Sequence, residues 1–222
     1  METQDKQNKQ SKKQSCLVDE TLGSEMTDTK YFIYVPAINL YVAKESHLSQ
    51  STWEESWDYL ECASKQMPTI NEFREFLKHL MSQPDNEEYQ TIFKRITSSY
   101  GAEWLDASFI KENGTLYLLT ENNKRKTGLE RCLMEDQENP RINLIDWVLN
   151  NHTNQGLPIE NVNSGNLSYI KPGENNRSIA VWSAYSDYSG GNGARLDCHT
   201  IPNYSCNHIG VRQCYRPNGG RK

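Results

Sequence analysis

Residues 178–214 read SIAVWSAYSDYSGGNGARLDCHTIPNYSCNHIGVRQC, and 15 of these 37 residues are Tyr, Ser, Gly or Asn. Tyrosine and tryptophan provide large contact areas with few rotatable bonds, while Ser, Gly and Asn provide adaptable hydrogen bonds. The composition is therefore typical of a recognition surface. A loop rich in Gly, Ser and Asn that has no partner would show the same composition.

Small or apolar residues alternate in this stretch with residues of changing chemistry. Because successive side chains of a β-strand point to opposite faces, we expect the first set to point inward and much of the second set outward. The inward set is Ala180, Ala184, Leu196, Cys198, Ile201, Ile209 and Val211. The outward set is Trp182, Tyr185, Asp187, Tyr188, Asn192, Arg195, Asp197, His199, Asn203, Tyr204, Asn207 and His208.

The clearest helix signal lies upstream, in residues 67–82, MPTINEFREFLKHLMS. Thr69 and Glu72 have the spacing of a capping box, in which each side chain bonds the backbone N–H of the other residue. Apolar residues then recur with the period of a helix, at Phe73, Phe76, Leu77 and Leu80. The pattern predicts an amphipathic helix that packs on a core.

Other local patterns supply the rest of the core. Residues 31–43, YFIYVPAINLYVA, predict strand, turn and strand around Pro36, which cannot donate to a sheet ladder. A short helix is expected in residues 51–65, and a second amphipathic helix from about Glu87. The first helix should bury Trp53, Trp57 and Tyr59, and the second should bury Tyr89, Ile92, Phe93 and Ile96.

A β-hairpin is predicted for residues 102–121, because Asn113-Gly114 suits a two-residue turn with positive φ angles. Residues 142–151, INLIDWVLNN, predict a short helix, and residues 154–165 a loop. That helix is expected to bury Leu144, Ile145, Val148 and Leu149. The order of elements predicts an α+β fold with two helices on small antiparallel sheets and a loop-rich C-terminal region.

Residues 1–29 contain no aromatic residue and predict a disordered tail, which leaves residues 30–222 as one domain. The net charge of −5 argues against a nucleic-acid partner, since affinity for a phosphate backbone rests on Lys and Arg. No apolar run reaches the length of a membrane span, and the N-terminus lacks the apolar core of a signal peptide. We expect a soluble protein, either cytoplasmic or, if it serves in attachment, associated with a cell or virion surface.

The six cysteines are expected to be free thiols, although a disulfide or a zinc site involving Cys198, Cys206 and Cys214 is an alternative. Structural zinc sites usually contain closely spaced ligand pairs, which this region lacks, so we expect no metal and no cofactor. The chain also contains none of the common hydrolase, phosphate-binding or dinucleotide-binding motifs. A nucleophilic pair of Cys198 and His208 remains open, but no catalytic residue is assigned.

Segments from residue 67 onward resemble the variable proteins of diversity-generating retroelements, particularly those of archaea and archaeal viruses. The resemblance runs through MPTINEFREFL, AEWLDASF, LERCLMED, NQGLP, GNLSYIKP and LDCHTIPNYSCNHIGVR. Its best motif, Gly210-Val211-Arg212, is similar to the closing strand of C-type-lectin domains of the formylglycine-generating-enzyme type.

The resemblance implies a calcium-free C-type-lectin scaffold whose C-terminal segment is changed by mutagenic reverse transcription to alter its binding specificity. The outward set would contain the variable residues that contact a protein or other macromolecular ligand. Leu196, Cys198, Ile209, Gly210, Val211 and Arg212 would belong to the scaffold. The alternative function is a cysteine-dependent oxidase, because an enzymatic branch of the same superfamily oxidises a substrate cysteine.

Overall fold

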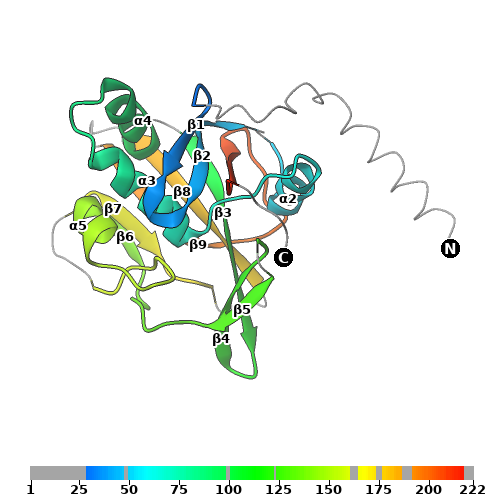
Figure 1. The fold of residues 1–222 in the computed structure, drawn as a ribbon. Helices are drawn as coiled ribbons and strands as arrows, with labels where there is room; N and C mark the ends of the chain where they lie inside the picture. The colour runs from blue at the N-terminus through cyan, green and yellow to red at the C-terminus, as the bar shows by residue number, and fades with distance from the viewer. Residues whose placement is uncertain are drawn as a thin grey trace, which may run out of the picture.

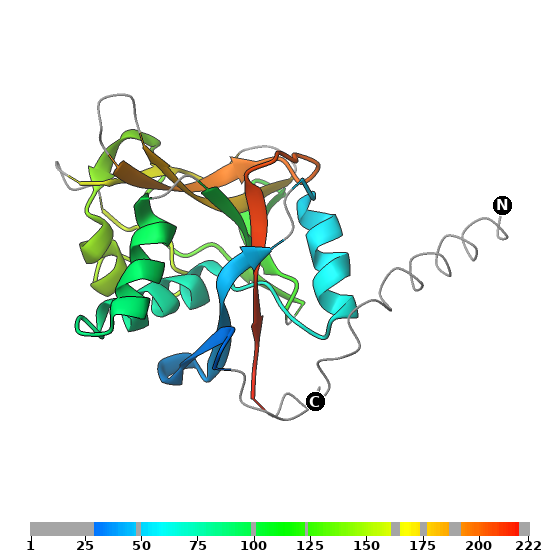
Figure 2. The same cartoon turned by 90° about the horizontal axis from the view of Figure 1, so that it is seen from above.

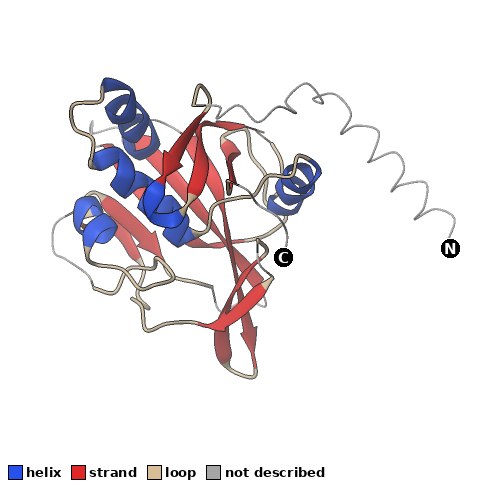
Figure 3. Cartoon of the chain, viewed as in Figure 1, coloured by secondary structure: helices blue, strands red, loops and turns tan. Residues whose placement is uncertain are grey.

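In the part of the chain that the structure describes, ten strands form one sheet, and four α-helices cover its two faces (Figures 1 and 3). This computed structural model describes residues 29–47, 50–98, 101–122, 124–160, 165–173, 177–186 and 192–217, without the side chains of residues 138–141, 185, 186 and 192. The described strands are β1 (Phe32–Val35), β2 (Leu40–His47), β3 (Gly101–Glu112), β4 (Thr115–Thr120), β5 (Arg125–Gly128), β6 (Gln137–Ile142), β7 (Leu167–Ile170), β8 (Arg177–Ser186), β9 (Asn192–Thr200) and β10 (Ile209–Tyr215).

Strand pairing joins the two ends of the described chain. The sheet order is β1-β2-β10-β3-β8-β9-β7-β6, so the late strand β10 lies between β2 and β3. β10 runs antiparallel to β2 and parallel to β3, whereas β3 and β8 are antiparallel. β4 pairs with the distal part of β3, and with β5 it forms a hairpin that extends away from α3 and α4 (Figure 1).

Helices α3 (Ile70–Met81), α4 (Glu87–Ser98) and α5 (Leu144–Leu149) lie on one face of the sheet, and α2 (Trp53–Cys62) lies on the other (Figure 2). The larger core lies between the sheet and helices α3, α4 and α5, and it contains Phe73, Phe76 and Leu80 of α3. A smaller core under α2 includes Trp53 and Leu60. The sheet is therefore buried on both faces over much of its area. This explains why neighbouring residues of β3, which point to opposite faces, are both apolar: Trp104 lies in the smaller core and Leu105 in the larger one.

The strongest local signals of the sequence are confirmed. Thr69 accepts the backbone N–H of Glu72, whose carboxylate accepts the N–H of Thr69, so the capping box begins α3 as predicted. Asn113 and Gly114 have φ angles of 49° and 80°, the left-handed values that a tight β3–β4 turn requires. The strand–turn–strand at the start, the helices at α2 and α4, and the short helix at α5 also form where they were expected.

Several expectations about the C-terminal half are wrong. The region is mostly strand and not loop-rich, and it joins one mixed sheet in place of small antiparallel sheets. In α5, Ile145 and Leu149 are exposed, and Trp147, which was not included among the buried residues, is fully buried. The α+β class is nevertheless consistent with the structure. The predicted tail, apart from Thr29, lies outside the described residues.

Candidate functional site

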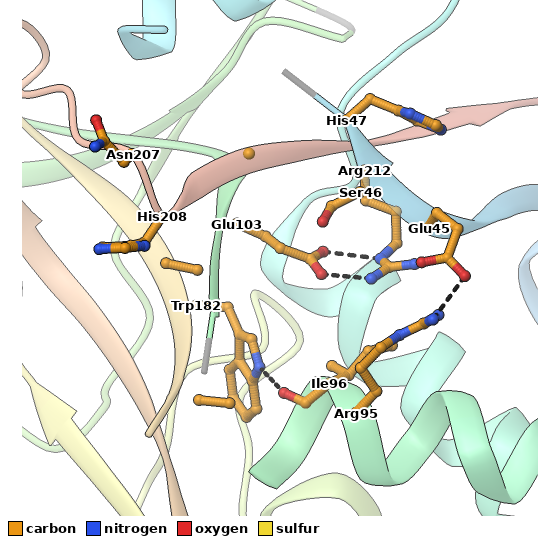
Figure 4. Close-up of a pocket in the computed structure, with 14 residues that line it drawn as sticks. Glu45, Ser46, His47, Arg95, Ile96, Glu103, Trp182, Asn207, His208 and Arg212 are labelled. Carbon is orange, nitrogen blue, oxygen red and sulfur yellow. Dashed lines mark hydrogen bonds and ion pairs between the residues drawn. The ribbon is translucent and has the colours of Figure 1, made fainter. Parts of the chain in front are cut away.

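A pocket of about 410 Å³ opens where five elements meet at one end of the sheet (Figure 4). The end of β2 contributes Glu45, and the last turns of α4 contribute Arg95. β3 and β10 contribute Glu103 and Arg212, and the middle of β8 contributes Trp182. These elements are brought together by the pairing of β10 with β2 and β3, because that pairing aligns the end of β2 with the starts of β10 and β3.

A buried ion pair between Arg212 and Glu103 lines the pocket. The Nε–H of Arg212 donates to Glu103 Oε2 at 2.8 Å, and its Nη2 donates to Glu103 Oε1. Nη1 donates to the carbonyl oxygen of Ala43 at 2.6 Å, and the guanidinium lies over the ring of Phe76. Arg212 is 2% exposed, so both charges are held in place by their mutual contacts inside the protein.

A second ion pair lies at the mouth. Arg95 Nη1 donates to Glu45 Oε1 at 2.6 Å, and Arg95 Nη2 donates to the carbonyl oxygen of Lys44 at 2.8 Å. Both side chains are substantially exposed, so this pair contributes little to stability but gives the mouth two opposite charges. Figure 4 shows both ion pairs among the residues that line the pocket.

Trp182 is a core residue, and its predicted outward orientation is wrong. It is 1% exposed, stacks against Trp147 with ring centroids 5.5 Å apart, and packs against Phe73. Its indole N–H donates to the carbonyl oxygen of Ile96 at 2.9 Å, which ties β8 to α4. Trp182 has the same strand parity as the buried Ala180 and Ala184, so it lies on the inward face of β8.

The remaining residues of the predicted outward set fall into four groups. His199, Asn203, Tyr204, Asn207 and His208 are exposed, and Arg195 and Asp197 on β9 are half-buried. Tyr185 and Asn192 belong to β8 and β9, but their side chains are not described. Asp187 and Tyr188 lie outside the described residues.

Asn207 and His208 are the two exposed members of this set that line the pocket. They lie directly before β10 and bring the end of the C-terminal segment to the rim. In the inward set, only Ile201 is misplaced, since it is 48% exposed in the β9–β10 connection. Gly210, Val211 and Arg212 are buried in β10, as a structural role requires.

Two of the three C-terminal cysteines offer little nucleophilic character. Cys198 and Cys214 are fully buried free thiols, and Cys206 is a half-buried one. Burial raises the pKa of the Cys198 thiol and of the Cys214 thiol well above the usual range, with nearby acidic groups adding to the shift. Both thiols are therefore protonated at neutral pH and unsuited to attack a substrate.

Four charged residues of the pocket were not identified from the sequence as functional. Glu45, Arg95 and Glu103 carry no local motif, and Arg212 was assigned to the scaffold alone. Glu103 and Arg212 are 109 positions apart, and only the parallel pairing of β3 with β10 brings them together.

Within the described residues, none of the helices combines the length and apolar character that a bilayer crossing requires. No protein-family model, curated protein or solved structure matches the chain.

Proposed function

We propose that the protein is a ligand-binding protein of the receptor or attachment type. Its C-terminal segment, residues 178–214, would be diversified by mutagenic reverse transcription, as in the archaeal variable proteins that it resembles. The C-type-lectin assignment belongs to the same proposal, and the ligand is a protein or another macromolecule.

One observation carries this proposal: within the same short segment, exposed side chains lie in the connection between β9 and β10, and buried side chains lie in the two strands. Asn203, Tyr204, Asn207 and His208 are exposed, and the last two line the pocket. The segments on either side of them, β9 up to Thr200 and β10 from Ile209, are anchored in the sheet. Changes at the exposed positions therefore alter the surface without removing a core contact, and tyrosine and asparagine at such positions suit recognition.

The alternative of a cysteine-dependent oxidase has weaker support. Oxidation of a substrate thiol by enzyme cysteines requires accessible, ionisable sulfur. Cys198 and Cys214 are buried and have raised pKa values, so two of the three C-terminal thiols do not meet this requirement. We therefore retain binding as the proposed function.

The test is to sequence the encoding gene from many individuals of its natural population. We expect amino-acid changes to cluster at Asn203, Tyr204, Asn207 and His208, and to be absent at the buried Trp182. A near-copy of the segment next to a reverse transcriptase gene should accompany this pattern. The α3 segment is the internal control, because its buried stripe and exposed face should vary only at the background rate. An even spread of changes along the chain would refute the proposal.

A further inference from the structure

Arg212 has hydrogen-bonding capacity that its protein partners do not use. A guanidinium has five N–H donors, and three of those of Arg212 bond Glu103 Oε1, Glu103 Oε2 and the Ala43 carbonyl oxygen. One N–H on each Nη atom has no acceptor among the described residues. Because the side chain is buried and lines the pocket, an oxygen atom inside the pocket is the natural acceptor for these two groups.

The charges of the pocket are balanced before any ligand enters. Arg212 is paired with Glu103, and Arg95 with Glu45, so each carboxylate and guanidinium group among the described residues that line the pocket has an oppositely charged partner. A ligand carboxylate at Arg212 would also be repelled by Glu103, and a ligand ammonium group near Glu45 would be repelled by Arg95. An uncharged polar group avoids both penalties.

The wall also offers an acceptor beside the donors. Glu45 Oε1 accepts from Arg95, and its second oxygen has no hydrogen-bond partner among the described residues. Figure 4 labels both residues among those that line the pocket, and they come from the paired strands β2 and β10, in which Arg212 lies opposite Ser46. A planar group with one carbonyl oxygen and one NH₂ group matches this pair, since it accepts from Arg212 while it donates to Glu45.

The remaining walls leave space for the stem of a side chain. Ala184, Gly101 and Gly210 line the pocket, and a Cβ atom built on Gly101 would meet nothing within 4 Å. Ile96 and the ring of Trp182 supply apolar surface. We infer that this pocket binds the carboxamide side chain of a glutamine or asparagine of the ligand, between the Arg212 guanidinium and the Glu45 carboxylate. This inference rests on the proposed binding function and names the chemistry that anchors the ligand.

The experiment uses three small probes: N-acetyl-glutamine methylamide, N-acetyl-glutamate methylamide and N-acetyl-lysine methylamide. Each is titrated into the isotopically labelled full chain, and the NMR signals of Arg212 Nε–H and Trp182 Nε1–H are followed. We expect the glutamine probe to shift both signals, and the charged probes to bind about tenfold more weakly, as expected for the loss of one good polar contact. Equal or tighter binding of the glutamate probe, or no shift with any probe, would overturn the inference.

Glu45→Gln is the test variant, because Glu45 is exposed and its replacement should leave the fold intact. It should weaken the glutamine probe about tenfold, since a charge-assisted hydrogen bond becomes a neutral one. Glu88→Gln is the matched control, because Glu88 is an equally exposed glutamate paired with Lys44 outside the pocket, and it should have no effect. Equal affinities in the two variants would contradict the role of Glu45.

The outcomes separate this inference from the proposed function. If the gene shows the expected variation but no probe binds, only the carboxamide inference fails. If the glutamine probe binds but the gene shows no clustered variation, the pocket is real and the diversification proposal fails.

Discussion

Asp106 should make the stability of this protein depend on pH. The side chain is fully buried in β3, where the strand register shifts between Trp104 and Ser108. Its two carboxylate oxygens accept the backbone N–H groups of Glu121 and Asn122, at 2.8 and 3.0 Å, and so hold the β4–β5 turn. Burial raises the pKa of Asp106 from 3.8 to about 7, although the two backbone N–H donors act in the opposite direction.

Other ionisable groups near Asp106 belong to three elements. Glu72 of α3 and Glu121 of the β4–β5 turn raise its pKa further, and the buried Cys214 of β10 also interacts with it. Arg216 bonds Glu72 at 2.6 Å and partly offsets that negative charge. The site therefore keeps a net preference for a protonated carboxyl.

The sign and size of the effect follow from proton linkage. Since the folded state holds the Asp106 proton more tightly than the unfolded state, this contribution to stability is fully present below pH 3.8 and is lost as the pH rises to about 7. The difference of roughly three pKa units corresponds to a loss of about 4 kcal/mol in the free energy of unfolding.

Asp106→Asn removes this titration but also removes an acceptor. An asparagine oxygen accepts one of the two backbone N–H groups, while its NH₂ group faces the other, which costs about 1–2 kcal/mol. The variant should therefore be less stable than wild type at pH 4 and more stable at pH 8, with the two curves crossing near about pH 5.

Urea unfolding followed by tryptophan fluorescence between pH 4 and 8 measures both curves. Asp85→Asn is the control, because that side chain is exposed and its variant should follow the wild-type curve. A constant difference between wild type and Asp106→Asn at every pH would refute the raised pKa.

Three further predictions concern the buried ion pair, the packing of the core and the cap of α3. Glu103→Gln leaves the charge of Arg212 buried without its partner, so the free energy of unfolding should fall by about 3–5 kcal/mol, and an unchanged urea midpoint would contradict this. Trp182→Ala should cost about 3–5 kcal/mol in the same assay through the cavity left in the core, whereas a loss under about 1 kcal/mol would place the ring outside the core. Thr69→Ala should cost about 1 kcal/mol through loss of the cap that pairs with Glu72, and Thr69→Ser, which keeps the hydroxyl, should restore most of it.

Periodicity in β8 could have identified Trp182 correctly. It is two positions from Ala180 and from Ala184, so a strand that buries both alanines also buries the tryptophan. The prediction gave more weight to the frequent role of Trp in recognition surfaces than to its position. The error in α5 is similar, because Ile145 and Leu149 lie on the helix face opposite the core that Trp147 fills.

The amino-acid sequence alone determined the features that depend on near neighbours. The capping box of Thr69 and Glu72, the apolar stripe of α3 and the Asn113-Gly114 turn are formed by residues within a few positions of one another, so local patterns predict them. Only the tertiary structure decided that β10 lies between β2 and β3, which joins Glu103 to Arg212 and creates the pocket. Pairing between distant strands depends on the combined burial of many side chains, and no single stretch of the chain encodes that choice.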